Sequence, residues 1–242
     1  MGYILYEGAS LLDGQPIVAI LTENSVNQKT GPMAQVWIMR SDMSPTEAIK
    51  SGDDSSVCGD CPHRPANLGS CYVNVWQAPR AVYDTYKRGV YTRSVTAAAM
   101  SRVARRQPAI RLGAYGDPAA VPMGVWDALT AGCPSWTGYT HQWRVLDAAA
   151  WAPKFMASAD TAAEALEARA AGWRTFRVRR AGDPPLTGEF VCPAAAESRQ
   201  AQAYHTCMSC RSCNGVRPGR DRMAHPVIII HGSRAGRFNE AA

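Results

Sequence analysis

Strands and helices alternate along the second half of the chain, and this alternation limits the possible folds more than any other feature. Strand-like apolar segments are expected at residues 109–115, 135–143, 153–160 and 173–178, and helices at 121–132 and 161–172. The second helix begins with Thr161 and Glu164, a capping-box pair, and both helices end at a glycine. Short turns between the segments predict βα units, which assemble into a parallel sheet.

The first part of the chain has a different pattern. Two apolar runs, 16–21 and 34–39, flank a polar segment and predict an antiparallel hairpin. A helix is expected to follow at 45–51, and its signals are Ser44, Pro45, Glu47 and Gly52. Residues 79–106 are predicted to be mainly helical, and residues 226–230 to form a last strand.

These segments predict an α/β fold: a partial (β/α) barrel with parallel strands, an N-terminal hairpin and a C-terminal loop that carries a cysteine cluster. We expect a single domain over residues 1–242. Its parts would be a hairpin and helix (1–54), a βα core with the first cysteine cluster (55–190), and the second cluster with the last strand (191–242).

Eight cysteines occur in a chain that does not need disulfides. Apolar residues make up 46% of the sequence, and no segment approaches the roughly 20 apolar residues of a membrane span. The chain begins without the basic and apolar segments of a secretion signal, so we expect a cytoplasmic protein with no membrane partner. Because thiols stay reduced in the cytoplasm, closely spaced cysteines indicate metal binding.

The formal charge is +6, and the basic residues are far more often arginine than lysine. Two groups of arginines are Arg102, Arg105, Arg106 and Arg111, and Arg174, Arg177, Arg179 and Arg180. A basic surface suits a nucleotide or nucleic-acid partner. A general bias of the composition toward arginine explains the two groups equally well.

The C-terminal cysteines form the sharper of two patterns. Cys207, Cys210 and Cys213 have C-x2-C-x2-C spacing, and Cys192 precedes a proline upstream. Three close cysteines with a remote one before proline are typical of bacterial ferredoxin-type iron–sulfur sites. Four thiolates also satisfy tetrahedral zinc. The pattern therefore predicts a closed, structural site that holds a [4Fe–4S] cluster or, alternatively, zinc.

The first group, Cys58, Cys61 and Cys71, has no fourth cysteine nearby. Three thiolates on a cubane cluster would leave one iron open to a substrate or cofactor. The alternative is a zinc ion completed by His63, two residues after Cys61. In that case the chain would hold two zinc ions, one at each site.

Polar residues follow the expected parallel strands, where sites of such folds lie. They include Tyr115 and Asp117, His141 and Gln142, Ser158 and Asp160, and Arg177 and Arg179. We expect Asp117, His141 and Asp160 to converge on one cavity as catalytic candidates, with His141 able to move a proton. Cofactor-binding candidates are Tyr72, Tyr115, Gln142 and Arg177. Any one of these residues has a structural explanation as well, for example as a turn or cap residue.

A three-cysteine loop with an aromatic residue beside its last cysteine, followed by βα units, resembles the radical S-adenosylmethionine superfamily. The segments "RLGAYGDP", "GYTHQW" and "MASAD" also resemble rim segments of phage-encoded proteins with a similar barrel. The superfamily spacing is C-x3-C-x2-C, whereas this chain has C-x2-C-x9-C. The resemblance implies one open [4Fe–4S] cluster on Cys58, Cys61 and Cys71, an auxiliary closed cluster, and S-adenosylmethionine bound to the open iron.

Two functions are consistent with these patterns. The first is a radical S-adenosylmethionine-type iron–sulfur enzyme acting on a nucleotide, nucleic-acid or amino-acid-like substrate, served by an electron-donor protein. The second is a non-enzymatic zinc protein that binds nucleic acid in phage or plasmid replication. Metal and sulfide analysis separates them, because only the first contains acid-labile sulfide.

Overall fold

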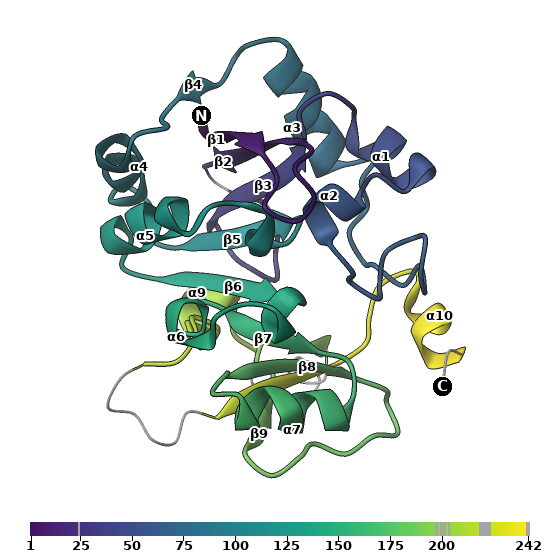
Figure 1. Ribbon diagram of the computed structural model, residues 1–242. Coiled ribbons are helices and arrows are strands. Elements are labelled where there is room, and N and C mark those ends of the chain that lie inside the picture. The colour runs from purple at the N-terminus through teal and green to yellow at the C-terminus, as the bar shows by residue number, and fades with distance from the viewer. Residues whose placement is uncertain (24, 197, 199–201, 203, 218–223, 241–242) are drawn as a thin grey trace.

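The computed structural model describes residues 1–242 except 24, 197, 199–201, 203, 218–223 and 241–242. One ten-stranded sheet runs through the described chain (Figure 1), in the order β4-β1-β2-β3-β5-β6-β7-β8-β10-β9. Most neighbouring strands are parallel. The sheet is not closed into a barrel, because β4 and β9 are its two edges. The α/β class predicted from the sequence is confirmed, in the form of an open sheet.

The described strands are β1 (Gly2–Ala9), β2 (Pro16–Thr22), β3 (Ala34–Arg40), β4 (Thr92–Arg93), β5 (Ile110–Tyr115), β6 (Trp136–Thr140), β7 (Met156–Ala159), β8 (Thr175–Arg179), β9 (Glu189–Val191) and β10 (His225–Ile229). The described helices are α1 (Pro45–Ser51), α2 (Ser55–Cys58), α3 (Ala78–Lys87), α4 (Ala97–Ala104), α5 (Met123–Gly132), α6 (Ala148–Trp151), α7 (Ala162–Ala170), α9 (Cys207–Cys210) and α10 (Ala235–Glu240). Two short 3₁₀ helices are η1 (Pro118–Ala120) and η2 (Gln142–Arg144).

The N-terminal strands β1, β2 and β3 are the antiparallel part of the sheet. The predicted hairpin is confirmed as β2 and β3, while β1 is an additional strand that pairs with β2. Helix α1 has the expected capping box between Ser44 and Glu47 and stops at Gly52, whose φ of 88° is accessible to glycine. Residues 79–106 are less helical than expected, since β4 separates α3 from α4.

From β5 onward the strands run parallel, as the strand–helix alternation predicts. Helix α5 connects β5 to β6, and α7 connects β7 to β8 and packs on both of these strands. The last strand, β10, pairs with β8 on one side and with β9 on the other. Parallel strands place their carboxyl ends at one edge, so the residues that follow β5, β6 and β7 lie close together.

The main hydrophobic core lies between the strands and the helices that pack on them. Trp126 of α5 and Phe155 before β7 are fully buried and meet edge to face, with ring centroids 5.8 Å apart. Within the described residues, no helix combines the length and apolar character needed to cross a membrane.

Candidate metal centre

A cavity of about 430 Å³ lies on one face of the sheet, and both cysteine groups border it. The cysteines that line the cavity are Cys58, Cys61, Cys71, Cys192, Cys207, Cys210 and Cys213. The eighth, Cys133, is buried elsewhere, with its thiol 3.0 Å from the carbonyl of Ser135. The structure therefore brings together seven thiols that the sequence divides into two groups.

The sheet supplies the other wall of the cavity through residues that alternate along the strands. Tyr115 of β5, Tyr139 of β6, Ser158 of β7 and Phe176 of β8 are among the lining side chains. The ring centroids of Tyr139 and Phe176 are 4.9 Å apart. Because side chains at every second position of a strand share a face, the cavity wall follows directly from the strand register.

Arg64 anchors the loop that carries the first cysteine group. Its guanidinium pairs with both carboxylate oxygens of Asp54, at 2.8 and 3.0 Å, and also donates to the carbonyls of Gly52 and Gly59. Asp54 is 1% exposed, so this bidentate pair is largely removed from water. The loop is held against α1 and α2 at one point and returns through a hydrogen bond from Cys71 N to the carbonyl of His63.

The three cysteines of the first group are half-buried and influence one another. Burial, and then the neighbouring Cys61 and Cys71, raise the pKa of Cys58 well above its usual value. Burial is also the main cause that raises the pKa of Cys71. Thiols with a raised pKa, such as Cys58 and Cys71, become thiolates readily only beside a cation that compensates their charge, which is the environment a metal centre supplies.

His63 does not join the thiols of the first group. Its Nδ1 lies 2.6 Å from Ser70 Oγ, and its Nε2 lies 2.8 Å from Asp160 Oδ1. Both ring nitrogens are therefore engaged by other groups. The alternative of a zinc ion held by three cysteines and His63 finds no support in this arrangement.

The second cysteine group is fixed to the sheet and to the β2–β3 connection by backbone hydrogen bonds. Cys207 N donates to the carbonyl of Lys29 at 3.1 Å, and Cys192 N donates to the carbonyl of Val227 at 2.8 Å. The carbonyl of Cys213 accepts from Gly138 N in β6 at 3.1 Å. Three elements that are far apart in the sequence thus hold the four cysteines in place.

Charge compensation is available beside the second group. Burial raises the pKa of Cys207, while the positive charges of Arg111 and Lys29 act in the opposite direction. Burial, helped by the neighbouring Cys207 and Cys210, raises the pKa of Cys192 to about 11. An anionic four-thiolate centre would be stabilised by these two basic side chains.

The spacing of the sulfurs bears on the kind of metal centre. In the described chain, one group alone brings three potential ligand atoms within 4.8 Å of one another, and it contains His63, His141 and Asp160 but no cysteine. A zinc ion with Zn–S bonds of about 2.3 Å holds its sulfurs about 3.8 Å apart. A cubane cluster binds each thiolate through a different iron and holds the sulfurs farther apart. Among the described residues, no cysteine belongs to a group of three ligand atoms with the short spacing of a zinc site.

The three residues predicted as catalytic candidates lie together. Asp117 Oδ2 accepts from His141 N at 2.8 Å, and His141 Nε2 lies 3.3 Å from Asp160 Oδ2. Asp117 and His141 line the cavity beside Cys61. Asp117 also caps η1 through Ala119 N at 2.9 Å, so both of its oxygens accept backbone hydrogen bonds. Asp117 acts as a positioning residue for His141.

The side chain of His141 lies between Cys61 and Asp160. Burial alone would lower the pKa of His141, but Cys61 and Asp160 act against burial and raise the pKa well above its usual value. Burial would likewise raise the pKa of Asp160, and the two histidines lower it instead. Asp160 and the two histidines thus stabilise each other's charged forms at the edge of an otherwise mostly apolar cavity.

The predicted cofactor-binding residues differ in where they lie. Tyr72 and Tyr115 line the cavity, and the hydroxyl of Tyr115 is buried without a hydrogen-bond partner among the described residues. Gln142 is buried beside the cavity, with Nε2 3.5 Å from the carbonyl of Cys58. Arg177 does not reach the cavity: it points from the opposite face of β8 and pairs with Glu189 at 2.7 Å.

Tyr139 and Lys29 also line the cavity, and neither was predicted from the sequence. Tyr139 lies two positions before His141, and the two-residue period of a strand would have placed both on one face. Lys29 belongs to the polar segment of the hairpin, and no local signal connects it to the C-terminal cysteines.

Comparison of the chain with protein-family models, with curated proteins and with solved structures gave no match. The functional argument therefore depends on the geometry of the cavity and of its two cysteine groups.

Proposed function

We propose that the protein is an iron–sulfur enzyme of the radical S-adenosylmethionine type. It would act on a nucleotide, nucleic-acid or amino-acid-like substrate and receive its electron from a donor protein. The observation that carries the proposal is the arrangement of seven cysteines around one cavity on the face of a parallel sheet, three in one group and four in the other.

The first group fits a [4Fe–4S] cluster with one open iron. It offers three thiols, Cys58, Cys61 and Cys71, while the adjacent His63 is engaged by Ser70 and Asp160. Such a cluster supplies an electron and an open coordination position at which S-adenosylmethionine is bound and cleaved. Tyr115 lies beside these three cysteines, and its buried hydroxyl has no hydrogen-bond partner among the described residues, so it could bind a polar group of the cofactor or substrate.

The second group fits a closed cluster with four thiolates from Cys192, Cys207, Cys210 and Cys213. Its backbone ties to β6, β10 and the β2–β3 connection suit a structural role, because metal binding there would join distant parts of the chain. The sheet with its cavity on one face is consistent with the partial barrel that the resemblance implies. The protein walls would keep water from the reacting atoms.

The zinc-dependent nucleic-acid binder is less well supported. Arg174, Arg177 and Arg179 of the second arginine group are buried, so they are not displayed to nucleic-acid phosphates. Arg174 donates to the carbonyls of Ser212 and Gly215, at 2.7 and 3.0 Å, and so stabilises the second cysteine loop. Three of the arginines that suggested a nucleic-acid surface therefore lie inside the protein.

The proposal is tested by adding S-adenosylmethionine to the reduced, anaerobically reconstituted protein. We expect the paramagnetic signal of one cluster to change and that of the other to stay constant, with methionine and 5′-deoxyadenosine released. Cys61→Ser should abolish the response, while Cys133→Ser, the matched control at a cysteine outside the cavity, should retain it. If neither signal changes and no product forms in the wild-type protein, the radical function is wrong.

A further inference from the structure

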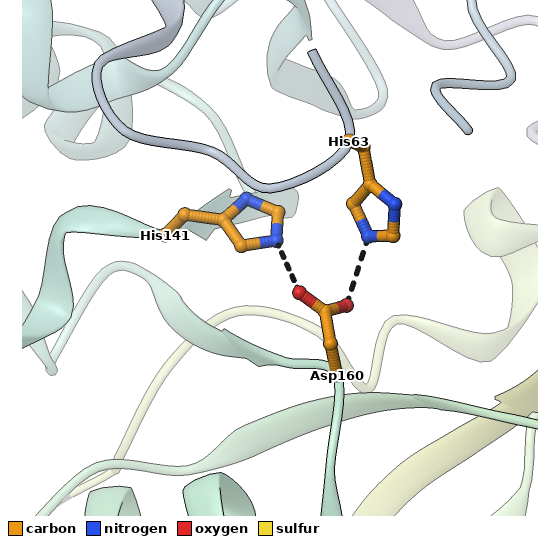
Figure 2. A group of neighbouring side chains, drawn as sticks. All are labelled: His63, His141 and Asp160. Atoms are coloured by element: carbon orange, nitrogen blue, oxygen red, sulfur yellow. Dashed lines mark hydrogen bonds and ion pairs between the residues drawn. The ribbon is translucent and has the colours of Figure 1, made fainter. Parts of the chain in front are cut away.

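His63, His141 and Asp160 form a group that the iron–sulfur proposal does not require. Figure 2 shows the two imidazole rings directed at the same carboxylate. His63 Nε2 lies 2.8 Å from Asp160 Oδ1, and His141 Nε2 lies 3.3 Å from Asp160 Oδ2. The side chains are 11%, 22% and 10% exposed, in the same order. The group therefore offers two nitrogens and two oxygens in a small, nearly enclosed space.

Neighbouring residues hold each member of the group in place. The Nδ1 of His63 is fixed by Ser70 Oγ at 2.6 Å, and its ring stacks on Phe238 with centroids 5.6 Å apart. The backbone of His141 is fixed by Asp117 at 2.8 Å. Supporting contacts of this kind orient metal-binding histidines and are a regular part of metal sites.

Asp160 has a similarly defined position. It follows β7 directly, and its backbone N–H donates to Glu164 Oε2 at 2.7 Å in the first turn of α7. The three side chains come from the first cysteine loop, from the end of β6 and from the end of β7. The fold thus brings together three ligand-type side chains, none of which is a cysteine.

Hydrogen bonding alone does not satisfy this group. His141 Nε2 is buried and makes no hydrogen bond within the described chain, because its contact with Asp160 at 3.3 Å lacks hydrogen-bond geometry. A buried ring nitrogen whose contact with a carboxylate is not a hydrogen bond is costly and calls for an explanation. A metal ion that takes the place of a proton on this nitrogen and accepts its lone pair would remove the cost.

We propose that His63, His141 and Asp160 bind one divalent transition-metal ion, zinc or ferrous iron. Their ligand atoms lie within 4.8 Å of one another. Bonds of about 2.0–2.2 Å from imidazole nitrogens and a carboxylate oxygen to a central ion require only small movements from there. Two neutral imidazoles and one carboxylate are a ligand set that these ions accept, and they leave further coordination positions open.

The open positions of the ion would be directed toward the cavity, since His63 and His141 both line it. A water or a polar group of a substrate could bind there, beside Cys61. The site does not rest on the iron–sulfur proposal, because none of its three ligands is a cysteine. The two proposals therefore fail separately.

The test measures zinc in the full-length protein after anaerobic reconstitution with iron and sulfide. Equilibrium dialysis against Zn²⁺ gives the zinc content, and X-ray absorption at the zinc edge gives the ligand shell. We compare the wild type with Asp160→Asn, which keeps the size of the side chain. We expect the wild type to bind one zinc per chain more than Asp160→Asn does. The ligands of this zinc should be nitrogen or oxygen atoms at about 2.0–2.2 Å, with no sulfur at about 2.3 Å.

Asp160→Asn should lower the affinity for this zinc by more than about 100-fold. Ser70→Ala should lower it by about 10- to 100-fold, because Ser70 supports the ligand His63. The matched control is Asp127→Asn, an exposed carboxylate that pairs with Lys154 and should leave zinc binding unchanged. Iron and sulfide contents report separately on the cysteine centres. Equal zinc affinity of the wild type and Asp160→Asn would overturn the proposal. If Asp160→Asn does not fold, a wild-type zinc spectrum with sulfur ligands alone would overturn it equally.

Discussion

Replacing Glu189 with glutamine tests the structural role that the buried ion pair assigns to Arg177. Glu189 is 0% exposed and Arg177 is 2% exposed. The carboxylate accepts from Arg177 Nε at 2.9 Å and from a terminal nitrogen of Arg177 at 2.7 Å, and Arg169 adds a third contact at 2.9 Å. Glutamine preserves the shape of the side chain but leaves the positive charge of Arg177 buried without a carboxylate.

The expected loss follows from the burial of the pair. Removing one partner of a buried salt bridge costs about 3–5 kcal/mol, because the remaining charge is uncompensated. For a chain of this size, 1 kcal/mol corresponds to about 2–4 °C in Tm, so the melting temperature should fall by about 6–20 °C. Circular dichroism melts at neutral pH measure this change.

The pH dependence gives the same experiment a second readout. Burial would raise the pKa of Glu189, but Arg177, the Leu186 N–H and Arg169 lower it below the usual 4.5. A carboxyl whose pKa is lowered on folding stabilises the protein above its unfolded pKa, and that stability is lost as the pH falls through the folded pKa. The wild type should therefore lose stability below about pH 4.5, and Glu189→Gln should lack this component of the loss.

The matched control is Glu167→Gln. Glu167 pairs with Arg144 at 2.8 Å, but the two side chains are 55% and 45% exposed, so water screens the pair and it should contribute little to stability. If the Tm of Glu189→Gln lies within about 2–4 °C of the Tm of Glu167→Gln, the reasoning is refuted. Arg177 would then not depend on Glu189 for its charge compensation.

Two further predictions concern the first cysteine group. Tyr115→Phe removes a buried hydroxyl that has no hydrogen-bond partner in the described part of the chain, so stability should stay within about 1 kcal/mol of the wild type. S-adenosylmethionine should bind up to about tenfold more weakly, as isothermal titration would measure. Unchanged binding would remove Tyr115 from the site. Arg64→Gln breaks the bidentate pair with the buried Asp54 and should lower the iron content of the first group by metal analysis, whereas full iron content would show that the loop is held by other contacts.

The sequence predicts the second half of the fold well because its signals are local. The helix starting at Thr161 has its side-chain cap, and β5 to β8 lie within a few residues of the expected segments. The position of β10 between β8 and β9 is a different matter, because it depends on pairing between residues about 50 positions apart, such as Val227 and Arg177. No local pattern encodes such a pairing. Strand β9, with three residues, is too short to give a signal.

The candidate site was predicted in part for the same reason. Residues after parallel strands meet at one edge, which is why Asp117, His141 and Asp160 were expected together. The orientation of His63 was beyond reach, since its partner Asp160 is 97 residues away. The position of Arg177 could have been found: Phe176 and Val178 face the cavity, so the residue between them faces away.

The most direct test of the central claim is the iron and acid-labile sulfide content of the anaerobically reconstituted protein. Two [4Fe–4S] clusters correspond to about eight iron and eight sulfide per chain, and the loss of either cluster to about four of each. We predict the full content for the wild type and for Cys133→Ser, and about half of it for Cys210→Ser. A colourless protein with two zinc ions per chain and no acid-labile sulfide would contradict the account.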